Sequence, residues 1–510
     1  MEALVTSAGR AEDFLDIDSK EAGDILAGTA GSLSSLFVEA FRQSVAELQK
    51  PAIGRNVRRY CADILTKGCF EVVSPLTGEI VQSGTSLVLT DKTVVFSFPE
   101  APTLFIGSGD LGRGYPLCAA IVLEPPVWIE LERTDWGFGR RHLEEFFALV
   151  ERLAWRPSTP NEPLLIVTGD SNFAHHAWNQ LSPFHDLANA GWRLGDFALV
   201  ATHLPLGPLH TFFPEIELAR PVHTSDSRLS ECNRLGQTCI TLGGERLQIG
   251  LTKRILEADP PLYTSRTWHI KENISGERGP VLWMSVRTRN RTLTNQVDVL
   301  VSIGEAFLSL APNGSVVIDG HSISGDQEAE GHEAAASIVA LDLQVADVIA
   351  ERLRKGGAKA RHRIYLAVGL PIIDSIWLSQ SASIYFTHHG TVQHKIGWFN
   401  ATPGMIHCNL EILATSPATW VAAQSEIAIC PQYIAAHLVT DAAEGPTDPF
   451  GELLKTNNYT ITNIEELTRT FANFTLEHMP PQTKLAKSTL FYNLTKLISR
   501  GRRSLQRWKA

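Results

Sequence analysis

Residues 280–286 read PVLWMSV, and four more apolar runs of this kind follow along the chain: SVVIDG (315–320), RIYLAVG (363–369), SIYFTHHG (383–390) and GMIHCN (404–409). Each run has the length of a buried strand. Stretches with helical spacing of their apolar residues lie between them, such as TNQVDVLVSIGEAFLSL (294–310) and ALDLQVADVIAERLRKGG (340–357). Strands that alternate with helices predict a parallel sheet with crossover helices, so the predicted fold class is α/β.

The first half of the chain predicts a more mixed architecture. Apolar residues at three- and four-residue steps predict helices over 21–65, and residues 70–130 are β-rich, with a hairpin predicted over 86–98. A buried strand over 163–170, followed by a helix, predicts an α/β core. We therefore expect a helical N-terminal segment (1–65), a β-rich and α/β domain (66–275), a second α/β domain (276–440) and a helical tail (441–510).

Composition limits the function classes. The formal net charge of -10 over 510 residues argues against a general nucleic-acid-binding protein. The seven cysteines are odd in number and form no CxxC pair, which indicates a reducing compartment and disfavours a zinc site of the usual spacing. No secretory signal and no apolar run long enough to span a membrane is visible, so we expect a cytoplasmic protein.

The loop after the first of the five runs is basic. In MSVRTRNRTLTNQ (284–296), Arg287, Arg289 and Arg291 follow the strand directly. Ligands of open α/β sheets bind beyond the carboxyl ends of the strands. A guanidinium there offers a fork of donors that matches phosphate oxygens, although a solvated basic loop explains the same residues.

A second candidate site lies in YFTHHGTVQHKIGWF (385–399). Gly390 allows a backbone to approach a ligand closely, Thr391 can cap the following helix, and the helix start with Lys395 favours a diphosphate. The alternative is a plain strand-to-helix turn with surface histidines. A zinc site is the third interpretation, but neighbouring strand residues point to opposite faces and no carboxylate accompanies the candidate ligands His388, His389, His394 and His407.

A third candidate lies in GDSNFAHHAWNQLSPFHDL (169–187). Asp170 stands at a predicted strand end, and His175 and His176 follow it. Histidine is the side chain best suited to take a proton near neutral pH, as a sugar-acceptor hydroxyl requires. The alternative is a pair of histidines that pack on the buried face of a helix.

In this order the three stretches resemble the family-61 glycosyltransferases, over roughly residues 165–415. The resemblance rests on Asn172 with His175 or His176, then Asn179 and Leu181; on Arg287, Arg291 and Asn295; on His389, Gly390 and Thr391; and on Pro403-Gly404. Thr391 stands where that family usually has Ala. The resemblance implies a GT-B-like fold, with two facing Rossmann-like domains after a helical and β-rich preface.

The resemblance also implies a function. It predicts transfer of a sugar from a nucleotide sugar to a glycan or lipid-linked acceptor, without a metal or other cofactor. Donor binding falls to the second domain, where Asp319 can contact the ribose or the acceptor, and Asp170, His175 or His176 supplies the catalytic group. A non-catalytic scaffold of the same fold and another nucleotide-sugar enzyme, such as an epimerase, are the alternatives.

The C-terminal stretch KLAKSTLFYNLTKLISRGRRSLQRWKA (484–510) reverses the charge of the chain. It carries eight basic residues and no acidic one, with apolar residues at helical spacing. A basic amphipathic helix can lie on an anionic membrane surface, which predicts peripheral contact with the inner face of a bacterial membrane. A helix that packs its apolar stripe on the protein is the alternative.

Overall fold

The computed structural model divides the chain into two compact units, Met1–Arg254 and Ile255–Ala510. The residues that it describes are 14–19, 34–90, 93–109, 111–133, 137–160, 164–216, 233, 237–258, 263–325, 329–356, 363–442 and 458–479. The C-terminal stretch 484–510 therefore lies outside the described residues. The predicted domain boundary near residue 275 falls in helix α11 (Ser265–Glu277), whose Ile270 and Ile274 pack in the second unit.

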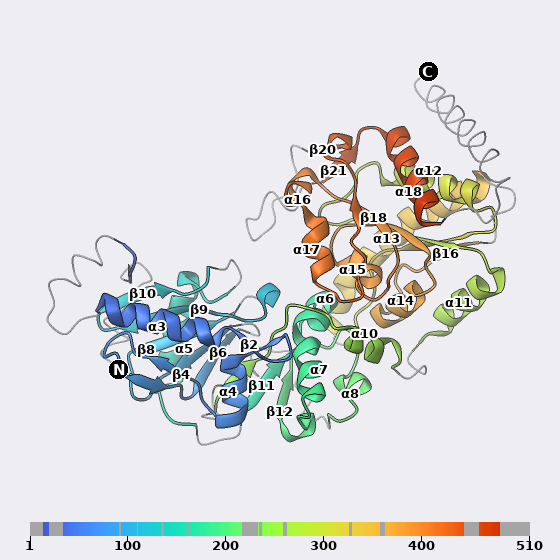
Figure 1. Ribbon diagram of the computed structural model, residues 1–510. Helices are drawn as coiled ribbons and strands as arrows, with labels where there is room; N and C mark the ends of the chain where they lie inside the picture. The colour runs from blue at the N-terminus through green and yellow to red at the C-terminus, as the bar shows by residue number, and fades with distance from the viewer. Residues whose placement is uncertain are drawn as a thin grey trace. The chain divides into compact units, whose positions relative to one another are not determined.

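The first unit contains a β-rich layer. Its six-stranded sheet has the order β1-β10-β9-β8-β7-β6 and is antiparallel except for β1. Strands β6, β8, β9 and β10 are labelled in Figure 1. The predicted hairpin over 86–98 is confirmed, because β6 and β7 pair antiparallel. Helix α5 (Leu143–Arg152) packs Phe146 and Val150 on this sheet. The strands are β1 (Leu15–Asp16), β6 (Ser86–Thr90), β7 (Thr93–Ser97), β8 (Leu104–Ser108), β9 (Leu117–Leu123) and β10 (Pro126–Glu130).

Two helices and a hairpin occupy the segment that we predicted to be helical. Helix α3 (Ser35–Leu48) ends before Pro51, and Gly54 has a φ of 58°, which helices do not adopt. The chain therefore turns through β2 (Pro51–Ile53) and β3 (Val57–Arg58) before α4 (Arg59–Lys67) begins. A second hairpin follows, made of β4 (Glu71–Val73) and β5 (Ile80–Gln82).

The rest of the first unit is α/β. A parallel three-stranded sheet has the order β12-β11-β13, with strands β11 (Leu165–Thr168), β12 (Ala198–Ala201) and β13 (Cys239–Thr241). The helical stretch after β11 consists of α6 (Phe173–His175), the π-helix η4 (His176–Leu181) and α7 (Ser182–Asn189). Helices α8 (Leu209–Phe212) and α10 (Ile249–Leu256) follow.

The second unit is built on a parallel six-stranded sheet, and all five predicted strands are confirmed. The strand order is β16-β15-β14-β17-β18-β19. The chain begins in the middle of the sheet at β14, adds strands outward to one edge, and then crosses back to build the other side. The strands are β14 (Val281–Ser285), β15 (Ser315–Asp319), β16 (Ile364–Leu366), β17 (Ile384–His388), β18 (Gly404–His407) and β19 (Gln432–Tyr433). The protein is thus a mixed α/β protein with several parallel sheets.

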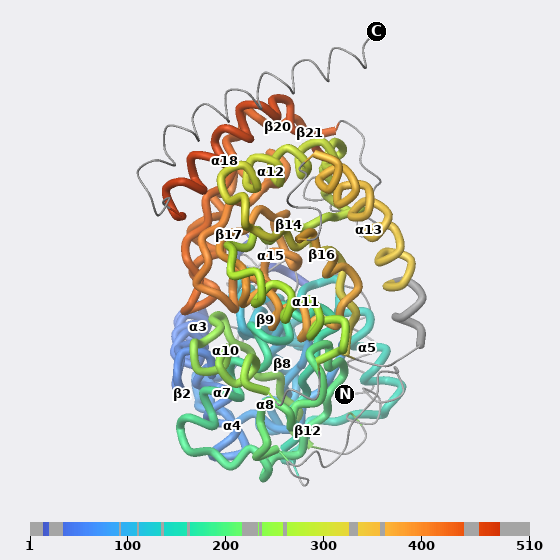
Figure 2. Tube along the Cα trace, turned by 90° about the vertical axis from the view of Figure 1, so that its right-hand side faces the viewer, coloured from blue at the N-terminus to red at the C-terminus, as the bar shows by residue number. Residues whose placement is uncertain are grey.

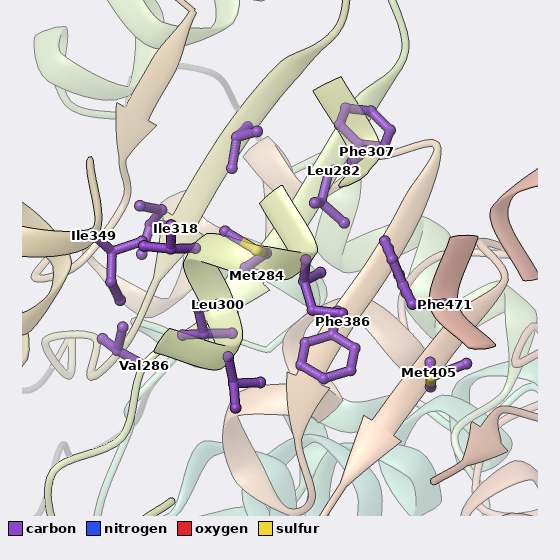
Figure 3. Packing of buried hydrophobic residues seen from close by; sticks show 14 of the residues in the cluster. Leu282, Met284, Val286, Leu300, Phe307, Ile318, Ile349, Phe386, Met405 and Phe471 are labelled. Carbon is purple, nitrogen blue, oxygen red and sulfur yellow. The ribbon is translucent and has the colours of Figure 1, made fainter. Parts of the chain in front are cut away.

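Helices cover this sheet. One core cluster joins Leu282 and Met284 of β14 and Phe386 of β17 to Leu300 and Phe471 of two helices (Figure 3). Those helices, α12 (Gln296–Leu310) and α18 (Ile464–His478), lie side by side (Figure 1, Figure 2). The remaining helices are α13 (Ala329–Gly356), α14 (Ile372–Ser379), α15 (Thr391–Gly397), α16 (Leu410–Ala414) and α17 (Pro417–Ala423).

A short hairpin lies in the part of the chain that we predicted to be a helical tail. Strand β20 (Val439–Asp441) pairs antiparallel with β21 (Tyr459–Ile461), immediately before α18. Tyr459 also bonds with the loop after β14, through its amide to Thr292 O at 3.1 Å and its carbonyl to Thr294 N at 2.8 Å. Within the described residues, no helix is long and apolar enough to cross a membrane.

Candidate functional site

The second unit places two of the predicted stretches beside each other. Strands β14 and β17 are hydrogen-bonded neighbours, and the chain continues from β14 toward one edge of the sheet and from β17 toward the other. This is the topological switch point of the sheet, where ligands of open α/β sheets bind. The basic loop follows β14, and His389-Gly390 follows β17.

The loop after β14 holds Arg287 firmly. The backbone of Arg287 bonds to the side-chain amide of Gln296, with its N–H at 3.2 Å and its carbonyl at 3.1 Å. Its Nε donates to the carbonyls of Arg289 and Asn290, at 2.9 and 2.8 Å. Asn290 and Arg291 both have φ of 50°, an uncommon conformation for residues with side chains. The loop thus fixes where the guanidinium group of Arg287 points.

Both guanidinium groups converge on Gly390. A Cβ atom built on Gly390 would lie 3.4 Å from Arg291 Nη2 and 3.6 Å from Arg287 Nη1. Arg287 Nη1 also donates to the carbonyl of His389 at 3.5 Å. Gly390 has φ 105° and ψ −154°, a region essentially limited to glycine. We call Arg287, Arg291 and Gly390 the arginine cradle.

The electrostatics of the arginine cradle favour an anion. Burial, followed by the charge of Arg291, lowers the pKa of Arg287 to about 9, so the group stays protonated near neutral pH. Burial also lowers the pKa of Arg291. Among the described residues, neither guanidinium forms an ion pair with a carboxylate. A bound phosphate would relieve the repulsion between two half-buried cations and accept their hydrogen bonds.

His389 lies next to the cradle and is held by two aromatic side chains. Its Nδ1 shares a hydrogen bond of 2.7 Å with Tyr433 Oη, and its ring meets Trp420 edge-on at 5.3 Å between centroids. Burial, with the charges of Arg291 and Arg287, lowers the pKa of His389 to about 3. His389 is therefore neutral near pH 7 and adds no charge to the site.

Asp319 and Lys395, both predicted to contact the donor, contact each other instead. Lys395 Nζ lies 2.6 Å from Asp319 Oδ2, and the two side chains are 2% and 0% exposed. The same Nζ donates to Gly320 O at 2.8 Å and to Ser322 Oγ at 2.9 Å. The ammonium thus makes two hydrogen bonds and one ion pair inside the protein. The charge that we expected at a diphosphate is compensated inside the protein.

Asn295 and Thr391 are close to the cradle residues in sequence, but each serves the local structure. The side chain of Asn295 bonds to Ile461 of β21, donating to its carbonyl at 2.9 Å and accepting from its N–H at 3.2 Å. This contact anchors the basic loop to the hairpin. Gly390, and not Thr391, is the N-cap residue of α15, which has only seven residues. A helix this short adds little to an anion site.

Sequence reasoning missed the aromatic surroundings of the cradle. Tyr433 ends β19, Trp420 lies on α17, and Tyr459 bonds His407 Nδ1 through its hydroxyl at 2.7 Å. The ring centroids of His407 and His388 lie 4.1 Å apart, and the charges of Arg287 and Arg291 help to lower the pKa of His388. The alternation of large and small side chains in YTI (459–461) is a weak strand signal. Nothing in the sequence shows that the aromatic rings of Tyr433, Trp420 and Tyr459 lie near this part of the sheet.

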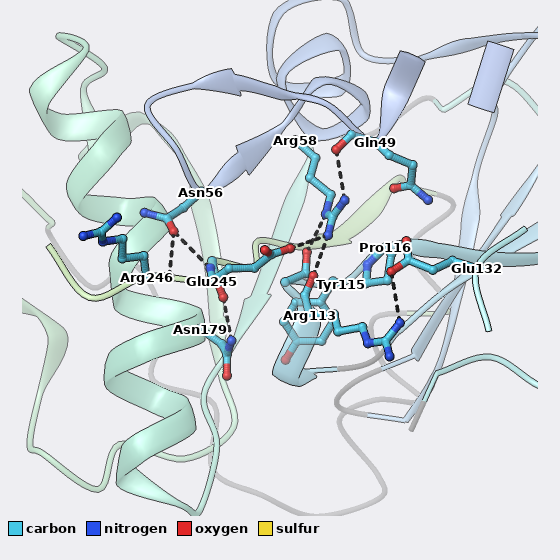
Figure 4. Close-up of polar contacts among 12 residues, drawn as sticks. Gln49, Asn56, Arg58, Arg113, Tyr115, Pro116, Glu132, Asn179, Glu245 and Arg246 are labelled. Atoms are coloured by element: carbon cyan, nitrogen blue, oxygen red, sulfur yellow. Dashed lines mark hydrogen bonds and ion pairs between the residues drawn. The ribbon is translucent and has the colours of Figure 1, made fainter. Parts of the chain in front are cut away.

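In the first unit, the surroundings of His175 determine which ring nitrogen carries the proton. Asn179 Nδ2 donates to Gly244 O at 2.5 Å (Figure 4). Its Oδ1 is left to face His175 Nδ1 at 2.9 Å. An amide oxygen only accepts hydrogen bonds, so Nδ1 carries the hydrogen and Nε2 keeps its lone pair. His175 is partly exposed, which leaves that lone pair accessible.

The loop that holds Asn179 is itself braced. Asn56 Oδ1 accepts hydrogen bonds from the N–H groups of Glu245 and Arg246, at 3.0 and 3.1 Å, and Arg58 pairs with Glu245 at 2.7 Å (Figure 4). The N–H of Gly244 also donates to the carbonyl of Asn179 at 2.6 Å. The position of His175 thus depends on residues far from it in sequence.

His176 and Asp170 are buried in the first unit. Gln180 Nε2 donates to Gly169 O and Tyr115 Oη, so its Oε1 faces His176 Nδ1 at 3.4 Å. Burial lowers the pKa of His176 to about 4. Asp170 accepts the N–H of Asn172 at 2.7 Å and shapes the turn before α6. His175 is therefore the one of the three that solvent can reach.

Of the four histidines considered for zinc, only His388 and His407 have neighbouring rings among the described residues. His394 stacks on Trp398 at 3.7 Å, while His389 bonds Tyr433. In the described part of the chain, no group of three or more His, Cys, Asp or Glu side chains is placed to hold a metal ion.

Comparisons with known proteins give no family. No protein-family model matches the chain, and no curated protein matches it. A putative UDP-N-acetylglucosamine 2-epimerase from Listeria monocytogenes is 14% identical over 57% of this chain and 68% of its own, with a TM-score of 0.22. The S. aureus MnaA–UDP co-structure is 13% identical over 51% of this chain and 60% of its own, with a TM-score of 0.20. TarM is 8% identical over 96% of this chain and 84% of its own, with a TM-score of 0.19. These likenesses are too weak to bear on fold or function, which rest on the residues described above.

Proposed function

We propose that the protein is a glycosyltransferase that uses a nucleotide-sugar donor, with the donor diphosphate bound in the arginine cradle of the second unit. The observation that carries this proposal is the convergence of Arg287 and Arg291 on Gly390 at the switch point of the sheet. Two cations without a carboxylate partner among the described residues suit the two negative phosphates of a leaving diphosphate. The family resemblance of the sequence supports the same assignment.

The proposed reaction uses His175 of the first unit as the general base. The acceptor hydroxyl gives its proton to His175 Nε2, and its oxygen forms the new bond to the anomeric carbon of the donor sugar. The bond between that carbon and the diphosphate oxygen breaks, and its electron pair leaves with the nucleoside diphosphate. Arg287 and Arg291 stabilise the charge that develops on this leaving group. A GT-B-like fold and a glycan or lipid-linked acceptor belong to the same proposal.

Titration of nucleoside diphosphates tests the cradle. A thermal-shift screen with UDP, GDP, CDP and ADP first identifies the preferred base, since a ligand at 100 times its Kd adds about 2.7 kcal/mol of stability. We expect Arg287→Ala and Arg291→Ala each to lose about 2–5 kcal/mol of binding free energy, because a half-buried contact with a phosphate is removed.

Arg289→Ala is the matched control. It removes the same charge from the same loop, but Arg289 is exposed and contributes only its backbone carbonyl to Arg287. Its affinity should stay close to that of the wild type. Equal affinity in all three variants would show that the diphosphate binds elsewhere. Normal binding without sugar transfer to any acceptor would favour a non-catalytic nucleotide-binding protein.

A further inference from the structure

Trp420 is an exposed aromatic side chain beside the arginine cradle. Its side chain is 38% exposed, on α17, and its Nε1 donates to Thr415 Oγ1 at 3.4 Å. A tryptophan that packs in a protein core exposes a much smaller fraction of its surface than Trp420 does. One exposed tryptophan alone shows nothing about a ligand, so its neighbours decide what it can do.

Those neighbours connect Trp420 to the cradle through a single residue. The edge-on contact with Trp420 and the hydrogen bond with Tyr433 leave His389 only 7% exposed. The carbonyl of His389 accepts from Arg287 Nη1, and Gly390 is the next residue. His389 therefore links the indole ring of Trp420 to Arg287 and Gly390 of the cradle.

We propose that Trp420 is the stacking surface for the base of the nucleotide whose diphosphate lies in the arginine cradle. This inference rests on the proposed function and adds the residue that distinguishes a nucleotide from a bare diphosphate. Any nucleobase has an aromatic face, so an indole ring favours all of them to a similar extent. Trp420 thereby sets the preference for a nucleoside diphosphate, while other groups select the base.

The charge beside Trp420 favours a nucleotide over other occupants of an exposed aromatic ring. A peptide or a second copy of this chain would have to satisfy two cations of the same site, since Arg287 and Arg291 lack ion pairs among the described residues. A nucleoside diphosphate supplies an aromatic face and two phosphates in one molecule. An isoprenyl diphosphate also joins a diphosphate to an apolar group, so the experiment must separate these two.

The experiment is calorimetric titration of the full chain with three probes: inorganic pyrophosphate, the preferred nucleoside diphosphate and farnesyl diphosphate. Trp420→Ala should weaken binding of the nucleoside diphosphate by about 5- to 150-fold, the loss of one stacked base. Its affinity for pyrophosphate should not change, and Trp420→Phe should keep most of the nucleotide affinity. Trp268→Ala is the control, because Trp268 is 39% exposed on the same unit but packs with Trp377 and Tyr263.

The possible outcomes distinguish a failure of the stacking surface from a failure of the arginine cradle. Unchanged nucleotide affinity in Trp420→Ala, together with a loss in Arg287→Ala, would overturn the stacking surface and leave the cradle in place. The stacking surface would also be overturned if Trp420→Ala weakened the affinity for farnesyl diphosphate more than the affinity for the nucleotide. That result would favour a lipid diphosphate as the ligand. If the wild-type chain binds neither pyrophosphate nor any nucleoside diphosphate, the proposed function fails and the stacking surface fails with it.

Discussion

At the scale of single residues, the decisive difference between His175 and His176 is their exposure to solvent. Both face an amide oxygen through Nδ1, so both keep their lone pair on Nε2. Nε2 of His176 is buried and has no hydrogen-bond partner among the described residues, whereas His175 is partly exposed. Only His175 combines a fixed tautomer with access, which is what a general base requires.

Substitution of the two histidines should therefore have opposite effects. We expect His175→Ala to lower the rate of sugar transfer by about 10²–10⁴-fold with little change in donor affinity, because the proton acceptor is lost while the arginine cradle remains. His176→Ala should instead lower the free energy of unfolding, because it leaves a cavity and frees Gln180 from a partner. Transfer rates with the donor found in the nucleotide screen, and urea denaturation of each variant, measure both effects.

Two results would contradict this assignment. A fully active His175→Ala would remove the general base from the proposed mechanism. Asn179→Ala provides a second check, since it keeps His175 but removes the acceptor that fixes its tautomer. It should lower the transfer rate less than His175→Ala does, and a larger loss would point to a structural role for Asn179.

At the scale of elements, the Asp319–Lys395 ion pair joins the end of β15 to α15. Its two charges are almost fully buried, and Ser375 of α14 adds a hydrogen bond to Asp319 Oδ1 at 3.3 Å. Burial raises the pKa of Asp319, while the adjacent ammonium acts in the opposite direction. The pair fixes the helix that starts at Gly390, and so it positions the arginine cradle without contact to a ligand.

Breaking this pair should cost stability. We expect Lys395→Ala to lower the free energy of unfolding by about 3–5 kcal/mol, because it leaves an uncompensated carboxylate in the core. The double variant Asp319→Asn with Lys395→Met should recover part of the loss, since no buried charge remains. Denaturant titrations of the single and double variants measure this coupling. A Lys395→Ala variant with wild-type stability and weakened nucleotide binding would instead return Lys395 to the donor site.

At the scale of the whole molecule, three buried histidines make the protein sensitive to acid. The pKa is lowered to about 4 for His176 and to about 3 for His389 and His407, in each case mainly by burial. The unfolded chain takes up these protons near pH 6.5, whereas the folded chain does not. Their contribution to stability is therefore fully present above pH 6.5 and is lost as the pH falls toward the folded values.

This sign gives a measurable slope. Between pH 6.5 and 5, each of these histidines should lower the free energy of unfolding by about 1.4 kcal/mol per pH unit. His176 acts on the first unit, and His389 and His407 act on the second. Urea denaturation at several pH values should show a shallower slope for the first unit in His176→Gln than in the wild type. Identical slopes would mean that His176 is protonated in the folded protein as easily as in the unfolded one.

The sequence predicted the second unit better than the first. Long apolar runs such as PVLWMSV (280–286) carry their own strand signal, and the parallel sheet follows from their alternation with helices. The helical spacing before residue 65 concealed a hairpin, because Pro51 and Gly54 act locally and override the pattern. Likewise, the charges of Arg287 and Lys395 look alike in sequence. Only the fold shows that Asp319 is within reach of one of them.

The same limit applies to the candidate site. Gly390 and the arginines were predicted from their positions directly after strands. The parallel topology brings the carboxyl ends of those strands together. Trp420, Tyr433 and Tyr459 reach these strand ends from elements with weak signals, so their proximity depends on tertiary contacts that no local pattern encodes. The membrane contact predicted for 484–510 stays a prediction.

The π-helix η4 has a consequence for recognising relatives of this chain. A π-helical turn closes its hydrogen bonds over one residue more than an α-helical turn does. Deleting one residue between His176 and Leu181 would rewind the segment as α-helix and turn everything before it by about 100° relative to α7. His175 would then lose its alignment with Asn179, while Asp186 of α7 would keep its bonds to the N–H groups of Arg55 and Asn56. In an alignment, a one-residue gap at this place would mark homologues that lack the His175 arrangement, even where both histidines are conserved.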